Sequence, residues 1–180
     1  MKKICFSLLL STGCILSVYA SNSNPIPNPP SAFAADSQTC QVNGGTLFVA
    51  TIVSAPVYKS GSSQQGVELS HTHVNAVPVG QKATTSNTYD VAMDNVFASG
   101  YDSAQPYNQV PSPLTQLKIG QNVEFCGQPY SGGGGIHWVH TNCGDTPTSS
   151  EPNGSVRIIN ADGSLGANLE NATEYCYLWQ

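Results

Sequence analysis

The chain is poor in charged residues, and basic residues are the scarcest of them. Its 180 residues include six Lys and Arg against eleven Asp and Glu, which gives a net charge of −5 at pH 7. A protein that binds a polynucleotide needs a stripe of Lys and Arg to neutralise the phosphates, and an anionic membrane surface requires a similar basic cluster. The composition therefore predicts no nucleic-acid partner and no electrostatic attachment to a membrane.

The sequence also lacks an apolar run of the roughly 20 residues that span a bilayer. The longest mostly apolar run extends from Ile4 to Ile15, follows Lys2 and Lys3, and precedes the small residues of Val18-Tyr19-Ala20. This order is typical of a secretory signal peptide. We therefore predict a signal peptide over residues 1–20, export to a periplasm or to the extracellular space, and no membrane insertion after cleavage.

Helical periodicity is nearly absent from the rest of the chain. Residues 21–37 are rich in Pro, Ser and Asn with few apolar residues, which predicts a disordered tether. Residues 38–180 carry short β-branched or aromatic segments separated by Gly, Pro, Asn and Ser, a pattern typical of a barrel or sandwich. We predict a single all-β domain, a small OB-like barrel or a related β-barrel or sandwich that is stabilised by disulfides. Its predicted strands cover residues 46–54, 67–74, 89–97, 123–126, 136–141, 155–160 and 173–179, with an irregular excursion over 95–114.

Removal of the predicted signal peptide leaves four cysteines, Cys40, Cys126, Cys143 and Cys176. An even count in an exported protein predicts two disulfides, which can be paired in three ways. Cys40 and Cys176 lie near the two ends of the domain, and Cys126 and Cys143 flank a run of four glycines, so we favour these two pairs. The alternative is that Cys143 is a nucleophile beside His140, but no thiol-enzyme signature accompanies it.

All four histidines fall in two clusters, His71-Thr72-His73 and His137-Trp138-Val139-His140. Residues two apart on a strand share a face, so His71 and His73 could ligate one metal ion. His137 and His140 are three apart and can join them only where a bulge or turn follows Trp138. Zinc or copper held by imidazoles is therefore one hypothesis. Metal-free acid–base chemistry and purely structural histidines are the alternatives.

Two signatures that would name a reaction are missing. No H-E-x-x-H helix is present, and Glu68, the acid nearest to the first histidine cluster, lies on the strand face opposite to His71. The tetraglycine of residues 132–135 lacks the Lys-Ser/Thr that follows a phosphate-binding loop, so it predicts a flexible hairpin turn.

Two segments together resemble a family of small exported bacterial domains of unknown function. They are Gly120-Gln121-Asn122-Val123-Glu124-Phe125-Cys126-Gly127 and Gly134-Gly135-Ile136-His137-Trp138-Val139-His140. Members of that family carry a G-D-x-V-E-F-x-G-x-Y strand followed by G-G-V-I-H-W-T-H-H, and an upstream A-H-N-I-D-x-A-P segment that corresponds to residues 73–78. The chain departs from the family at Thr141 and Asn142 and in its cysteines. The resemblance implies export and an OB-like barrel and brings no established activity.

The sequence leaves three classes of function. The leading one is an exported binding or interaction module in which Trp138, His137 and His140 contact an unidentified ligand or protein partner. The second is a metal-binding protein or metal-dependent hydrolase that uses His71, His73, His137 and His140. The third is a structural envelope protein without chemistry. No catalytic residue is identified, and enzyme activity is less favoured than binding.

Overall fold

The computed structural model describes residues 22–179, so the predicted signal peptide lies outside the described residues. The strands are β1 (Thr46–Ile52), β2 (Val57–Lys59), β3 (Ser63–Gln64), β4 (Val67–Glu68), β5 (His71–Pro78), β6 (Tyr89–Asp94), β7 (Asn122–Pro129), β8 (Gly135–His137) and β9 (Ser155–Ile158). The α-helices are α1 (Ala34–Val42) and α2 (Tyr101–Ala104). The 3-10 helices are η1 (Ser31–Phe33), η2 (Asn95–Phe97), η3 (Gln105–Tyr107), η4 (Leu114–Gln116) and η5 (Cys176–Trp179).

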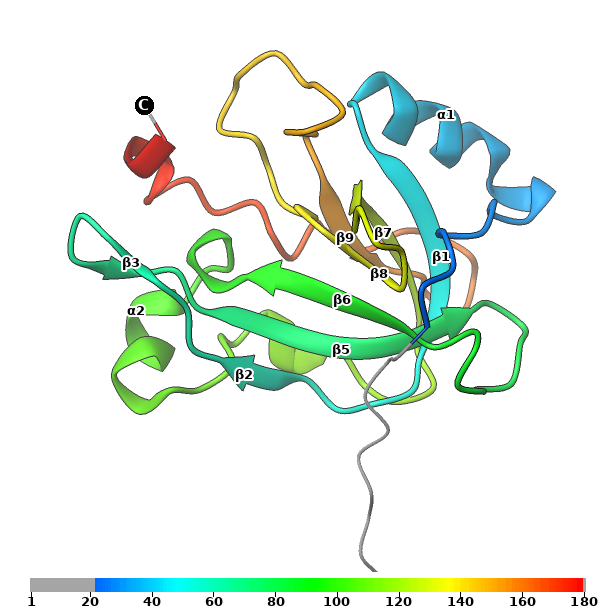
Figure 1. Ribbon diagram of the computed structural model, residues 1–180, viewed down its shortest axis with the longest axis horizontal. Helices are drawn as coiled ribbons and strands as arrows, with labels where there is room; N and C mark the ends of the chain where they lie inside the picture. Colours follow the sequence, from blue (N-terminus) through cyan, green and yellow to red (C-terminus); the bar gives the residue numbers. More distant parts are fainter. Residues whose placement is uncertain (1–21, 180) are drawn as a thin grey trace, which may run out of the picture.

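Five strands close into a barrel, which confirms the predicted all-β class. Their order is β1-β5-β6-β8-β7, and β7 pairs back onto β1. The β6–β8 pair is parallel, whereas the other four barrel pairs are antiparallel. β2 extends the sheet from β5, β9 extends it from β7, and β3 and β4 form a separate small hairpin (Figure 1).

The barrel interior is filled by the apolar residues that alternate along these strands. Phe48 of β1 lies at its centre, with ring centroids 5.2 Å from Tyr89 and 6.3 Å from Phe125. Along β5, Val74 and Ala76 are buried while His71 and His73 are not. Because successive side chains point to opposite faces, the same alternation that fills the core places both histidines on the outer surface of the barrel.

Several predicted strands are wrong in extent or type. The strand predicted over 89–97 ends at Asp94, and Asn95–Phe97 form the 3-10 helix η2. The strand predicted over 67–74 is broken at Leu69 and Ser70, where the Leu69 amide donates to the carbonyl of Ser62. The strand predicted over 136–141 ends at His137, because Trp138 has a φ of +52° and turns the chain. The segment predicted over 173–179 ends in the 3-10 helix η5, which forms its own i to i−3 hydrogen bonds.

The prediction of a disordered tether is wrong for residues 22–37. Residues 22–30 have no regular structure, but Ile26 packs against the core and the Tyr89 hydroxyl donates to the carbonyl of Pro25. The Gly134 amide donates to the carbonyl of Asn24 at 2.8 Å. Residues 31–42 then form η1 and α1, and α1 lies beside β1 (Figure 1). The segment is held by hydrogen bonds to main-chain carbonyl groups, most of them from side-chain donors, which its low apolar content does not reveal.

The disulfides join Cys40 to Cys126 and Cys143 to Cys176, so the favoured pairing is wrong. The reason is the β1–β7 pairing, which places Cys126 opposite Leu47, and α1 brings Cys40 to the same place. Both disulfides also leave no free Cys143 to act as a nucleophile. Two disulfides indicate an oxidising environment of the kind that exported proteins meet. Between residues 22 and 179, no helix is long and apolar enough to cross a membrane.

Candidate functional site

Three of the four histidines, His71, His73 and His137, meet on the outer surface of the barrel, whereas His140, predicted to share this surface, is buried behind it. β6 lies between β5 and β8, so the outward residues of the three strands form one continuous face. This face forms the wall of an open cleft of about 380 Å³, which we call the histidine cleft. It is lined by Ser62, Leu69, His71, His73, Ala92, Asp94, Val96, Tyr130, His137, Trp138 and Trp179.

Asp94 at the end of β6 pairs with His71 across the sheet. The two residues are directly opposite in the β5–β6 register, and the His71 Nε2 atom lies 2.5 Å from the Asp94 Oδ1 atom. This hydrogen bond is the main cause of a raised His71 pKa, which burial only partly opposes. The pair therefore favours the charged form of the imidazole at the edge of the histidine cleft.

His140 contacts the same carboxylate from inside the protein. The positive φ of Trp138 turns the chain after β8, so His140 is only 2% exposed and its ring stacks on Phe97 with centroids 3.7 Å apart. The His140 Nδ1 atom donates to the carbonyl of Thr141 at 2.7 Å, and Nε2 lies 3.0 Å from Asp94 Oδ2 without a well-directed hydrogen bond. Asp94 is thus held between a buried and a half-exposed imidazole.

The charge on Asp94 reflects opposing influences. Burial alone raises the pKa of this carboxyl group, but the hydrogen bonds and charges of His140 and His71 outweigh burial, and the net pKa lies well below 3.8. Glu170 is buried close to Asp94, and its carboxyl oxygens have no hydrogen-bond partner. Burial and the charge of Asp94 raise the pKa of Glu170 well above its ordinary value, so Asp94 is the ionised member of the two.

A second histidine–carboxylate pair lies beside the first. The His73 Nδ1 atom is 3.0 Å from both carboxylate oxygens of Asp90, and the Tyr130 hydroxyl donates to Asp90 Oδ2 at 2.7 Å. The rings of His71 and His73 are 6.2 Å apart. The face therefore presents two oriented imidazoles side by side, each positioned by an aspartate on β6.

His137 differs from His71 in its ionisation. Burial lowers its pKa, and the nearby charge of Asp94 opposes this only in part. Its ring lies 5.2 Å from that of Tyr130. The environment thus favours the neutral form of the imidazole at His137 and the charged form at His71; a neutral imidazole can accept and donate a hydrogen bond, whereas a charged one only donates.

Two tryptophans form the wall of the cleft that lies away from β5. Trp138 is half-buried, and its Nε1–H is buried without a hydrogen-bond partner. Trp179 of η5 is 38% exposed, and its ring centroid is 5.1 Å from that of Phe97. Both tryptophans also line a small adjoining cavity of about 80 Å³ that contains Asp145 and Glu151. A half-buried Trp138 that lines two hollows has the character expected of a binding residue more than of a core residue.

The predicted zinc or copper ion does not fit this arrangement. In the described part of the chain, no group of three or more His, Cys, Asp or Glu side chains is arranged to hold a metal ion. Several ring nitrogens are engaged elsewhere, because His71 Nε2 and His140 Nε2 face Asp94 while His140 Nδ1 faces a carbonyl oxygen. His73 in turn faces Asp90, so three of the four histidines face aspartates.

Four contributors to the site were missed by the sequence analysis: Asp90, Asp94, Tyr130 and Trp179. The signal for the aspartates was present, because Asp90, Ala92 and Asp94 alternate along β6 and fall on one face. Glu68, the acid nearest to the histidines in sequence, turns away and accepts hydrogen bonds from the Tyr58 hydroxyl and the Gly61 amide. Trp179 could not be assigned, because its position depends on the Cys143–Cys176 disulfide.

Comparisons with protein-family models, with curated proteins and with solved structures find no match to this chain. The resemblance based on the I-H-W-x-H segment therefore stays a prediction. The function is argued below from the geometry of the histidine cleft.

Proposed function

We propose that this chain is an exported OB-like binding module whose histidine cleft binds an uncharged polar ligand, with carbohydrate as the class that fits best. The cleft itself is the observation that supports it: a hollow of about 380 Å³ has the size of a small-molecule site. Export follows from the predicted signal peptide and agrees with the two disulfides. Whether the protein stays in a periplasm or leaves the cell is a separate question.

The strand order supports the OB-like assignment. Numbered within the barrel, the strands follow the order 1-2-3-5-4-1, the third and fifth are parallel, and helical segments lie between the third and fourth. OB folds bind oligonucleotides and oligosaccharides on the face of their second and third strands and the adjacent loops. In this chain those strands are β5 and β6, which carry His71, His73, Asp90 and Asp94.

The lining favours a sugar over a nucleic acid. The aromatic rings of Trp138, Trp179 and Tyr130 offer apolar surfaces against which the C–H face of a sugar ring can pack. The His137 ring, whose neutral form is favoured, can accept a hydrogen bond from a hydroxyl group, and the His71 ring, whose charged form is favoured, can donate one. The histidine cleft is lined by Asp94, with Asp90 bonded to His73 beside it, and by neither Lys nor Arg, whereas a polynucleotide would require basic residues.

Acid–base catalysis is the second candidate function. It is favoured by one observation, the opposite pKa shifts of His71 and His137 in the same cleft. A charged and a neutral imidazole facing one ligand form a general acid and a general base. A metal-dependent hydrolase is less favoured because Asp94 already engages the imidazoles. A purely structural role would leave the cleft unexplained.

Replacing His137 by Ala tests the binding proposal. We expect the affinity for the preferred sugar to fall roughly tenfold, which corresponds to the loss of one hydrogen bond. The melting temperature should change by no more than about 2 °C, because the ring is only half-buried and its removal breaks no buried pair of side chains. The measurement is a titration of neutral maltose-, cellulose- and chitin-derived oligosaccharides, followed by tryptophan fluorescence and by NMR, with a single-stranded DNA oligonucleotide alongside.

Tyr107→Ala serves as the matched control, because Tyr107 is an aromatic residue that is 72% exposed and lies outside the cleft. It should leave binding and melting unchanged. Binding of DNA in preference to every sugar would contradict the proposed ligand class. A collapse of the melting temperature in His137→Ala would instead assign this histidine a structural role.

A further inference from the structure

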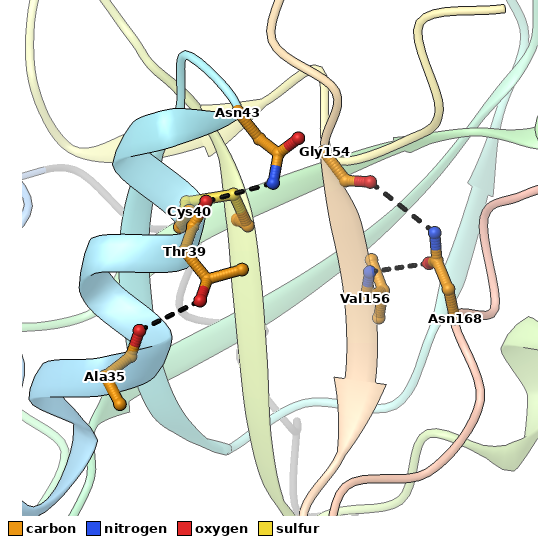
Figure 2. The surroundings of a disulfide bond; sticks show 8 residues. Ala35, Thr39, Cys40, Asn43, Gly154, Val156 and Asn168 are labelled. Carbon is orange, nitrogen blue, oxygen red and sulfur yellow. Dashed lines mark hydrogen bonds between the residues drawn. A yellow bond between two sulfur atoms is a disulfide. The ribbon is translucent and has the colours of Figure 1, made fainter. Parts of the chain in front are cut away.

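A second cleft lies on a different side of the barrel, between α1 and β9. Its volume is about 410 Å³, and the Cys40–Cys126 disulfide, which ties α1 to β7, lies in its wall. Figure 2 shows α1 and β9 facing each other with the disulfide between them. We call this hollow the helix cleft. It shares no residue with the histidine cleft.

Glu124 of β7 is an acidic residue in the wall of this cleft. Val123 and Phe125 point into the barrel core, so Glu124 points outward, beneath α1. Its side chain is only 3% exposed, and the Oε1 atom has no hydrogen-bond partner. A buried carboxyl oxygen without a donor is costly, and it marks the place where a ligand with hydrogen-bond donors would be stabilised.

Two other charged residues line the helix cleft, Asp36 on α1 and Arg157 on β9. Burial, together with the charge and a hydrogen bond of Asp36, raises the pKa of Glu124 to about 7, and Arg157 opposes this in part. Arg157 is opposite Glu124 in the β7–β9 register, but it is exposed and forms no ion pair among the residues described. The carboxyl groups of Glu124 and Asp36 thus lie together, and the Arg157 guanidinium is only loosely associated with them.

The remaining lining is mainly hydroxyl and amide. The Asn43 side-chain amide donates to the carbonyl of Thr39 at 2.9 Å, which leaves its oxygen pointing away from α1 and toward β9 (Figure 2). The main-chain amide of Asn153 donates to the main-chain carbonyl of Asn43, and this bond joins the end of α1 to the start of β9. The side-chain oxygen of Asn168 is already bonded to β9, since it accepts a hydrogen bond from the main-chain amide of Val156 (Figure 2). Polar oxygens therefore surround the two carboxyl groups.

We propose that the helix cleft binds a small ligand carrying a protonated amine and hydroxyl groups, with the amine held between Glu124 and Asp36. An ammonium group has three donors and no acceptor, which matches the unpartnered Glu124 Oε1 atom, the Asp36 carboxylate and the Asn43 oxygen. The volume is that of a small-molecule site. Hydroxyl groups on the ligand would meet Thr39, Ser155 and the neighbouring asparagines.

The test compares 1-amino-1-deoxy-D-sorbitol with D-sorbitol, which differ only by an amine in place of a hydroxyl. Isothermal titration at pH 8 should show saturable binding of the amine at least about tenfold tighter than that of sorbitol. Glu124→Gln should weaken amine binding roughly 10- to 100-fold, because it removes a charge-assisted hydrogen bond. Asp36→Asn should weaken it less, and Arg157→Gln should tighten it because a competing cation is lost.

Two variants serve as controls. Asp162→Asn removes an exposed turn carboxylate outside the cleft, and His137→Ala removes a residue of the histidine cleft, so both should bind the amine as the parent protein does. Lowering the pH from 8 to 6 should weaken binding several-fold, because Glu124 takes up a proton. Equal binding of sorbitol and its amine, unchanged binding in Glu124→Gln, or no saturable binding would each overturn the proposal. The proposal is independent of the sugar-binding role proposed for the histidine cleft.

Discussion

Replacing Asp94 by Asn is expected to lower the free energy of unfolding by about 2 kcal/mol, since it removes the carboxylate that two imidazoles face and leaves the buried His140 ring without its acceptor. Asp94 is the shared partner of His71 and His140, and His140 is 2% exposed with no other partner for Nε2. Chemical denaturation measures the loss. The same variant should lower the pKa of His71, because the hydrogen bond that raises this pKa disappears. An NMR titration measures the change.

The stabilisation by Asp94 and His71 is expected to depend on pH in a defined direction. The Asp94 pKa is depressed in the folded protein, so its contribution is present above 3.8 and is lost as the pH falls further. The His71 pKa is raised, so its contribution is fully present below 6.5 and is lost as the pH rises through the folded value. The pair should therefore stabilise the protein most between about pH 4 and 6.5, and Asp94→Asn should flatten this profile. Asp162→Asn is the control. If Asp94→Asn lowers the free energy of unfolding no more than Asp162→Asn does, Asp94 is not the stabilising shared partner of His71 and His140.

Replacing both Cys40 and Cys126 by Ser is expected to lower the free energy of unfolding by about 4 kcal/mol, because the disulfide closes a long loop of the unfolded chain. The two cysteines are 86 residues apart in sequence. For a domain of this size the melting temperature should fall by roughly 8 to 16 °C. Calorimetry measures the change, and limited proteolysis should show earlier cleavage within α1, which the disulfide fastens to β7.

The second disulfide provides the matched comparison. Cys143 and Cys176 are 33 residues apart, so the Cys143→Ser, Cys176→Ser protein should lose about 1 kcal/mol less. It should also displace Trp179, which lies three residues beyond Cys176, and so weaken ligand binding in the histidine cleft. The reverse order of stabilities would show that local packing, rather than loop closure, sets the contribution of each disulfide.

The barrel could be predicted because its signal is local. Short segments with period-2 alternation indicate half-buried strands, and β6 and β7 carry this pattern, while the continuous apolar run of β1 indicates a buried strand. The end of β8 could not be predicted, because only the turn at Trp138 shows that the chain leaves the sheet there. The disulfide pairing also depends on which strands are neighbours, and that information is not local.

The candidate site was predicted in part for the same reason. His71 and His73 share a face by simple alternation, and His137 joins them because β8 lies beside β6. The sequence did not show that β6 would present Asp94 to His71, since this requires the register of the β5–β6 pair. Without that register the histidines suggested a metal ion, whereas the structure gives each of His71 and His73 an aspartate.

The contacts that tie the beginning of the chain to its middle set an order of events during synthesis. Three early segments make contacts with segments that are synthesised much later: the Asn24 carbonyl bonds to the amide of Gly134, Cys40 to Cys126, and β1 pairs with β7. Contacts of such long sequence separation form slowly, and here none can form until most of the chain has emerged. A growing chain therefore cannot close the barrel until about three quarters of it has been synthesised.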